Sequence, residues 1–172
     1  MTRPPFDAFT DRDVELVSAQ LGRPARDVIG IAARCVCGAP TVVATRPRLS
    51  NGTPFPTLYY LTHPAATVAV SHLEAEGRMP LYAAELEADP AVGEAYRAAH
   101  EQYLADRDGI LAVDEIAGYS AGGMPTRVKC LHALVGHSLA AGLGVNPIGD
   151  RALAECGWSP EVCACAPDQR GS

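Results

Sequence analysis

The chain has 172 residues, which is enough for one domain with a sizeable apolar core. Its hydrophobic fraction of 48% and its charged fraction of 20% are typical of a globular protein. The formal net charge of -6 argues against a general attraction to nucleic acid or to an anionic membrane. No apolar run approaches the roughly 18 residues that a membrane helix needs, so we expect no membrane span.

The compartment follows from the N-terminal residues and the cysteines. The opening run MTRPPFDAFTDRD contains no apolar stretch that could serve as a secretory signal. We therefore expect a cytoplasmic protein whose six cysteines stay reduced. Thiols in that compartment serve metal binding or plain packing more often than disulfides.

The first predicted elements are a loose arm over residues 1–9, one helix and three strands. Thr10 can cap the helix, and two aspartates in its first turn suit the positive end of the helix dipole. The strands are expected at Val28 to Val36, Thr41 to Thr45 and Thr57 to Thr62. Because close turns separate them, an antiparallel sheet is favoured.

Helices dominate the rest of the chain. They are expected at 65–76, 81–88, 91–109 and 125–141, with one or two further turns at 150–156. The pattern predicts a single α+β domain over residues 10–155, in which a small antiparallel β-sheet of about three strands packs on one face against about five helices. Residues 156–172, which include Cys156, Cys163 and Cys165, are expected to form a disordered tail.

A metal site is predicted from thiols and an imidazole that lie apart in the sequence. Cys35 and Cys37 flank one strand residue and could face one ion, while His63 follows the third strand and Cys130 lies near the start of a helix. Four such ligands suit tetrahedral zinc, and an iron–sulfur cluster can use the same donors. In the alternative interpretation, Cys35 is a small buried apolar residue and Cys37 a turn residue.

Helix geometry restricts which residues can act together. At about 100° per residue, Cys130 and His132 point to nearly opposite sides of a continuous helix. They can share an ion only if the helix begins at or after Cys130.

A second predicted site would bind a small anion. Gly122 and Gly123 precede a helix, and two cations, Arg127 and Lys129, follow in its first turns. Backbone N–H groups and cations in this order can hold a phosphate or a carboxylate, and Arg107 could grip the same anion. In the alternative interpretation, the glycines form a tight turn and the cations are solvated.

Two histidines, His100 and His132, are candidate acid–base residues. With the anion site they support an alternative function: an enzyme that acts on a small molecule carrying a phosphate or a carboxylate. The sequence motifs of serine hydrolases and of H-E-x-x-H zinc enzymes are absent.

Three long runs together carry a resemblance to a known family. They are RCVCGAPTVVATRPRLSNGTPFPTLYYLTHP at 34–64, YRAAHEQYLADRD at 96–108 and SAGGMPTRVKCLHALVGHSLAAGLGVNPIGD at 120–150. The chain resembles domain-of-unknown-function family 501, a mainly actinobacterial and thus bacterial family, over roughly residues 13–155. The resemblance implies no reaction, although family members often carry cysteine where this chain has His63, which suits a metal ligand.

The neighbourhood of family genes supplies a third hypothesis. These genes tend to lie near those for enolase, a septum-formation initiator and an exopolyphosphatase-like protein. This neighbourhood is an association and not a mechanism, and it leaves open an alternative in which the chain is an interaction module, with an unknown protein partner, in cell division or the cell envelope. Such a module needs an exposed apolar patch.

Overall fold

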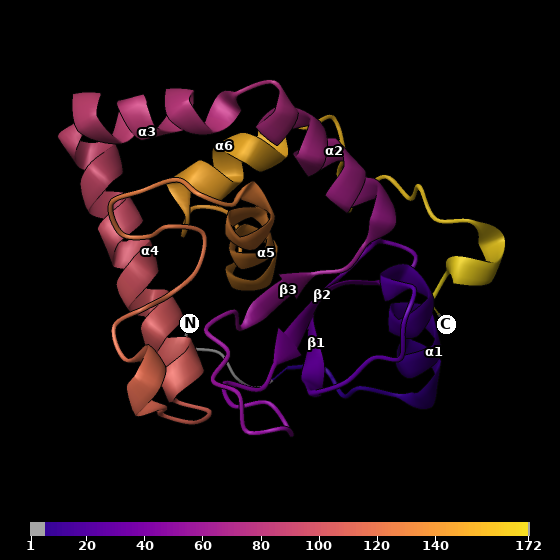
Figure 1. The fold of residues 1–172 in the computed structure, drawn as a ribbon. Coiled ribbons are helices and arrows are strands. Elements are labelled where there is room, and N and C mark those ends of the chain that lie inside the picture. The colour runs from indigo at the N-terminus through magenta and orange to yellow at the C-terminus, as the bar shows by residue number, and fades with distance from the viewer. Residues whose placement is uncertain (1–5, 172) are drawn as a thin grey trace.

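The fold combines a small sheet with helices, in a computed structural model that describes residues 6–171 (Figure 1). The strands are β1 (Val28–Arg34), β2 (Pro40–Thr45) and β3 (Tyr59–Leu61). The helices are α1 (Asp11–Leu21), α2 (Pro64–Ala75), α3 (Arg78–Ala88), α4 (Pro90–Asp108), α5 (Leu131–Ala141) and α6 (Pro147–Glu155), with two short 3-10 helices, η1 (Asp114–Ile116) and η2 (Pro167–Gln169). The predicted α+β class is confirmed.

The three strands form an antiparallel meander in the order β1-β2-β3. Every residue of the central strand β2 is buried, because helices cover both faces of the sheet. Val17 of α1 packs with Val43 on one face, whereas Val42 and Leu134 of α5 belong to the large core on the other. The sequence predicts helices on one face of the sheet only. Helices cover both faces because side chains alternate between the two sides of β2 and are apolar on both.

The described part of the N-terminal arm packs across β1, and residues 1–5 lie outside the described residues. Asp7 forms a β-bridge with Ile31, with N–O distances of 3.1 and 3.0 Å. Phe6 makes an edge-to-face contact with Tyr59, at 6.1 Å between ring centroids. Gly30 allows this approach, since a Cβ there would lie 2.6 Å from the Cβ of Phe6.

Helix α1 begins as its sequence predicts. The Thr10 hydroxyl accepts a hydrogen bond from the Asp13 backbone N–H at 3.2 Å, and the Asp13 carboxylate accepts one from the Thr10 backbone N–H at 3.1 Å. Arg34 at the end of β1 also donates two hydrogen bonds to Asp13, at 2.8 and 3.0 Å. Gly22 ends the helix in the left-handed conformation. The cap therefore also ties α1 to the sheet.

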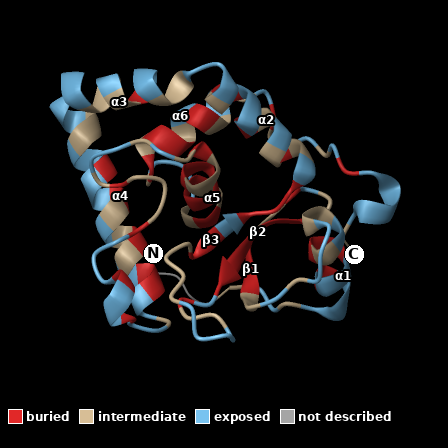
Figure 2. Cartoon of the chain, in the orientation of Figure 1, coloured by how far each residue is buried: buried red, intermediate tan, exposed pale blue. Residues whose placement is uncertain are grey.

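Helix α5 is the most deeply buried helix of the fold (Figure 2). It approaches β3 so closely that a Cβ at Gly136 would lie 3.1 Å from the Tyr59 carbonyl oxygen. In the next position, the His137 ring stacks on Tyr59 and meets Tyr103 edge-on, at centroid distances of 5.7 and 5.1 Å. Burial lowers the pKa of His137 to about 4, so this histidine is a neutral core residue.

Helix α5 begins six residues later than the sequence predicts. Residues 125–130 instead fold back onto the glycine loop, where the Gly122 carbonyl accepts a hydrogen bond from the Lys129 N–H at 2.7 Å. Cys130 is the N-cap residue, with φ −151° and ψ 106°, and Leu131 is the first helical residue. The geometric condition for Cys130 and His132 to act together is thus met.

Gly149 offers a test of the contact between α5 and α6. A Cβ at this position would lie 2.2 Å from the Leu134 carbonyl oxygen and 2.4 Å from Ser138 Oγ. We expect Gly149→Ala to lower the free energy of unfolding by about 1–3 kcal/mol, because overpacking outweighs the better helix propensity of alanine. Chemical denaturation measures the difference.

The matched control adds an atom to the solvent-exposed side of the same helix. Ala154→Ser should change the free energy of unfolding by no more than about 0.5 kcal/mol. If Gly149→Ala is as stable as the parent protein, the helices do not approach each other as closely as described.

Candidate metal centre

Four cysteine side chains converge at the edge of the sheet. They come in two pairs, Cys35 and Cys37 from the turn between β1 and β2, and Cys163 and Cys165 from the segment after α6. The four Sγ atoms all lie within 4.8 Å of one another. A tetrahedral zinc ion with Zn–S bonds of about 2.3 Å places its sulfur ligands roughly 3.8 Å apart. The cluster therefore fits a single ion after small adjustments.

The first pair is held by a tight turn and not by strand alternation. β1 ends at Arg34, one residue before the pair. The Cys35 backbone N–H donates to the Ala39 carbonyl at 2.8 Å, and the Gly38 N–H donates to the Cys35 carbonyl at 2.8 Å. Gly38 has φ 83°, a left-handed conformation that suits glycine. The turn directs both thiols to the same side, as predicted, but for a different reason.

The second pair is held by contacts between the C-terminal segment and this turn. The Val36 N–H donates to the Pro160 carbonyl at 2.8 Å. Gly171 lies so close to Gly38 that a Cβ on Gly171 would be 2.3 Å from the Gly38 carbonyl carbon. Arg12 of α1 donates to the Asp168 carbonyl at 2.7 Å, and Figure 1 shows the end of the chain beside α1. Residues expected to form a disordered tail thus have defined partners.

The thiols differ in their protonation. Burial raises the pKa of Cys35 and, more strongly, that of Cys165. Burial also raises the pKa of Cys37, but the Ala39 backbone N–H and the thiols of the second pair outweigh it and bring the pKa to about 7. Four thiolates at this spacing repel one another strongly, and a divalent cation removes that repulsion.

His63 lies beside the four thiols. Its Nε2 is 3.0 Å from Cys165 Sγ, and its side chain is 3% exposed. As the N-cap of α2, His63 accepts the Ala66 N–H at Nδ1 at 3.5 Å. A neutral ring with Nδ1 as acceptor carries its proton on Nε2, so that His63 donates an N–H···S hydrogen bond to Cys165.

Cys130 does not join this cluster. Of the four predicted ligands, the structure brings Cys35 and Cys37 together and places His63 at the edge of the site. Cys163 and Cys165 complete the set in place of Cys130. The signal that could have found them is the repeated C-x-C spacing, CVC at 35–37 and CAC at 163–165.

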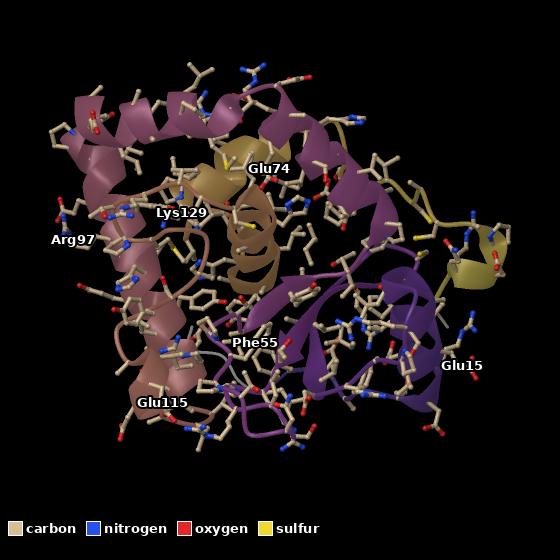
Figure 3. All side chains as sticks on the ribbon, viewed as in Figure 1. Glu15, Phe55, Glu74, Arg97, Glu115 and Lys129 are labelled. Atoms are coloured by element: carbon tan, nitrogen blue, oxygen red, sulfur yellow. The ribbon has the colours of Figure 1, made fainter. Side chains whose placement is uncertain are left out.

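Cys130 belongs to a second cluster, with Glu74 and His132, whose potential ligand atoms also lie within 4.8 Å of one another. Glu74 Oε1 accepts hydrogen bonds from the Leu131 backbone N–H at 2.7 Å and from His132 Nδ1 at 3.2 Å. His132 Nε2 lies 3.2 Å from the Thr67 carbonyl oxygen. Figure 3 shows Glu74 between α2 and α5.

The charges of this second cluster support one another. The Cys130 thiol and then Glu74 raise the pKa of His132 to about 9 despite partial burial. In turn, His132 lowers the pKa of Cys130, although burial opposes this effect. A positively charged His132 next to a thiol and a carboxylate is the result.

The glycines of the predicted anion site lie in a turn whose carbonyl groups accept backbone hydrogen bonds. The carbonyl groups of Gly122 and Gly123 accept hydrogen bonds from the backbone of Lys129 and Arg127, whose side chains are exposed. A Cβ at Gly122 would lie 2.5 Å from Leu134 Cδ2, so the glycine loop is a packed turn.

The other residues predicted to act in an anion-binding enzyme have local partners. Arg107 is fully buried and donates to the carbonyls of Ile116 and Tyr119, so its guanidinium holds the loop after α4. His100 Nδ1 lies 2.8 Å from Ser120 Oγ, and burial lowers its pKa. Both side chains thus contact residues that directly precede the glycine turn, Tyr119 and Ser120.

Together, the fold and the thiols define a small α+β protein with a candidate four-cysteine metal centre. The chain belongs to the family described as "Protein of unknown function (DUF501)", whose model matches residues 31–154. That span includes Cys35, Cys37 and His63 and ends before Cys163. Searches found no match among curated proteins or among solved structures. Within residues 6–171, no helix has the length and apolar character to cross a membrane.

The charge of His132 can be tested by nuclear magnetic resonance. We expect the ring protons of His132 to titrate near pH 9, well above the ordinary value of about 6.5. Because the folded-state pKa is raised, the charged ring stabilises the fold fully below about pH 6.5, and this contribution is lost as the pH rises through about 9.

His137 serves as the internal control in the same spectra. Burial lowers its pKa to about 4, so its ring should stay neutral from pH 8 down to about pH 5. A midpoint for His132 at or below 6.5 would contradict the charged cluster.

Proposed function

We propose that the protein binds one zinc ion through Cys35, Cys37, Cys163 and Cys165. The observation that carries the proposal is the convergence of four thiols, from two distant segments, within 4.8 Å. An iron–sulfur cluster, the other predicted cofactor, uses cysteines as well, but its several metal atoms hold the sulfurs farther apart than a single ion does. The short spacing favours one tetrahedral ion.

The geometry favours a structural role for this ion. A site with four cysteine ligands has no open position for water or substrate, in contrast to a catalytic zinc site with three protein ligands. The ion would cross-link the β1–β2 turn to the C-terminal segment, in addition to contacts such as the hydrogen bond from the Val36 N–H to the Pro160 carbonyl. Metal binding would therefore contribute directly to the stability of that segment.

His63 would support the ion without binding it. Its Nε2–H donates to Cys165 Sγ, and the Trp158 ring lies against it at 5.2 Å between centroids. Hydrogen bonds to thiolate ligands offset the negative charge that four of them bring to one ion. The backbone N–H groups of Cys37 and Ala39 do the same for Cys35 and Cys37.

Metal content and native mass spectrometry test the proposal. We expect one zinc per chain in the purified protein and none in the double variant Cys163→Ser/Cys165→Ser. The control variants are Cys156→Ser, whose thiol bonds to backbone carbonyls near α6, and Cys130→Ser. Both variants should keep the metal. If the ligand set predicted from the sequence were correct, Cys130→Ser would lose it.

The outcomes separate the alternatives. Stoichiometric iron with visible absorption would indicate an iron–sulfur cluster or a single iron ion in place of zinc. A folded protein that takes up no metal when supplied with zinc would overturn the proposal.

Removal of zinc by a chelator should expose residues 156–171 to proteolysis before the rest of the chain, because the ion anchors them.

A further inference from the structure

The cluster of Glu74, Cys130 and His132 is a second site of reactive side chains, independent of the proposed zinc centre. His63 begins α2 at the zinc centre, and Glu74 lies eleven residues further along the helix, or about 16 Å at 1.5 Å per residue. The cluster is half-buried, and its three side chains come from α2, from the N-cap of α5 and from the first turn of α5. The chemistry of this second cluster is therefore separate from that of the proposed zinc centre.

The hydrogen bonds of His132 determine its charge. Nδ1 faces the Glu74 carboxylate, and the same Oε1 accepts the Leu131 N–H, so this oxygen is an acceptor. Nε2 lies 3.2 Å from the Thr67 carbonyl, which can only accept, and 3.1 Å from the Ser71 hydroxyl, which can accept as well as donate. A ring that donates from both nitrogens is an imidazolium, and neither nitrogen then has a lone pair for a metal ion. The geometry thus favours a cation over a metal ligand.

This cation and the position of Cys130 at the start of a helix both favour the thiolate form of Cys130. Cys130 is the N-cap residue of the 11-residue helix α5, where the helix dipole favours negative charge. A thiolate beside an imidazolium that a carboxylate orients is the arrangement of an activated nucleophile. The second observation that points to a ligand is a cavity beside the pair.

This cavity has a volume of about 230 Å³. Its lining includes Cys130, His132, Thr57, Tyr60, Leu61 and Thr67. A thiolate at Cys130 beside the Glu74 carboxylate would set two negative groups against the one cation of His132, an arrangement that disfavours phosphates and carboxylates. The small volume and the mainly apolar lining suit an uncharged acyl group.

We infer that Cys130 is a nucleophile that accepts an acyl group from an uncharged activated ester or thioester, with His132 as its general acid–base partner and Glu74 as the positioning residue. The thiolate attacks the acyl carbon, the S–C bond forms, and the bond to the leaving group breaks. The leaving group takes the ring proton of His132. Water then attacks the enzyme thioester, returns a proton to His132 and releases the carboxylic acid and the thiolate.

The first experiment measures how fast iodoacetamide alkylates each cysteine in the intact protein, by peptide mass spectrometry. At about pH 10 all accessible thiols are ionised, so the ratio of the rate near pH 7 to the rate near pH 10 separates ionisation from accessibility. An ordinary thiol with a pKa of about 8.5 is only about 3% ionised near pH 7. We expect the ratio for Cys130 to exceed that for Cys156, the half-buried comparator, by at least about tenfold.

Variants identify the source of the activation. His132→Gln should lower the ratio for Cys130 to that of an ordinary thiol, because the cation is lost. His72→Gln, the same change at an exposed histidine of α2, should leave it unchanged. Equal ratios for Cys130 and Cys156, or a ratio unaffected by His132→Gln, would overturn the inference.

The second experiment uses p-nitrophenyl acetate as the acyl donor. We expect a burst of one equivalent of nitrophenolate and an acetyl group on the Cys130 peptide, both absent in Cys130→Ser. Acetylation confined to other residues would overturn the acyl-transfer role. A second stoichiometric metal ion that is lost in Cys130→Ser, while the zinc of the four-cysteine centre remains, would show a metal site here and equally overturn it.

Discussion

The close approach of α5 to β3 is the contact on which the positions of the Cys130 cluster and of His63 depend. At Gly136 no side chain separates the helix from the Tyr59 carbonyl, and His137 stacks on the same tyrosine. This contact holds the first turn of α5 against α2, where the Leu131 N–H meets the Glu74 carboxylate. Since β3 leads directly into α2, the same packing also positions His63 at the edge of the sheet.

Local sequence signals predicted the elements that local interactions determine. The Thr10 cap with Asp13 begins α1, and the turns between short β-branched runs gave three antiparallel strands. The start of α5 was missed because Pro125 can occupy the first position of a helix. In the structure, the N–H groups of Lys129 and Cys130 instead bond to the carbonyl of Gly122, an interaction that the periodicity of the sequence does not record. Propensity is a weak prior where such contacts compete.

In the candidate site, too, the sequence revealed the residues that are close together in the chain and missed those that distant contacts position. Cys35 and Cys37 could be singled out because only one residue separates them in the sequence. Their partners, Cys163 and Cys165, lie in a segment without hydrophobic periodicity, whose order comes from contacts such as Val36 with Pro160. A segment of this kind looks disordered when read alone, because the interactions that fix it lie more than a hundred residues away.

The two clusters relate differently to the family. The matched span, 31–154, contains all three residues of the proposed acyl-transfer cluster, which lie on α2, on α5 and at the N-cap of α5. The four-cysteine centre instead joins two residues of that span to two that follow it. An activity that depends on the matched span alone can therefore use Cys130, His132 and Glu74, but not a complete set of four thiols. In the proposed arrangement, the metal ion would hold the C-terminal segment against the sheet, while the proposed acyl-transfer chemistry would take place where α2 meets the start of α5.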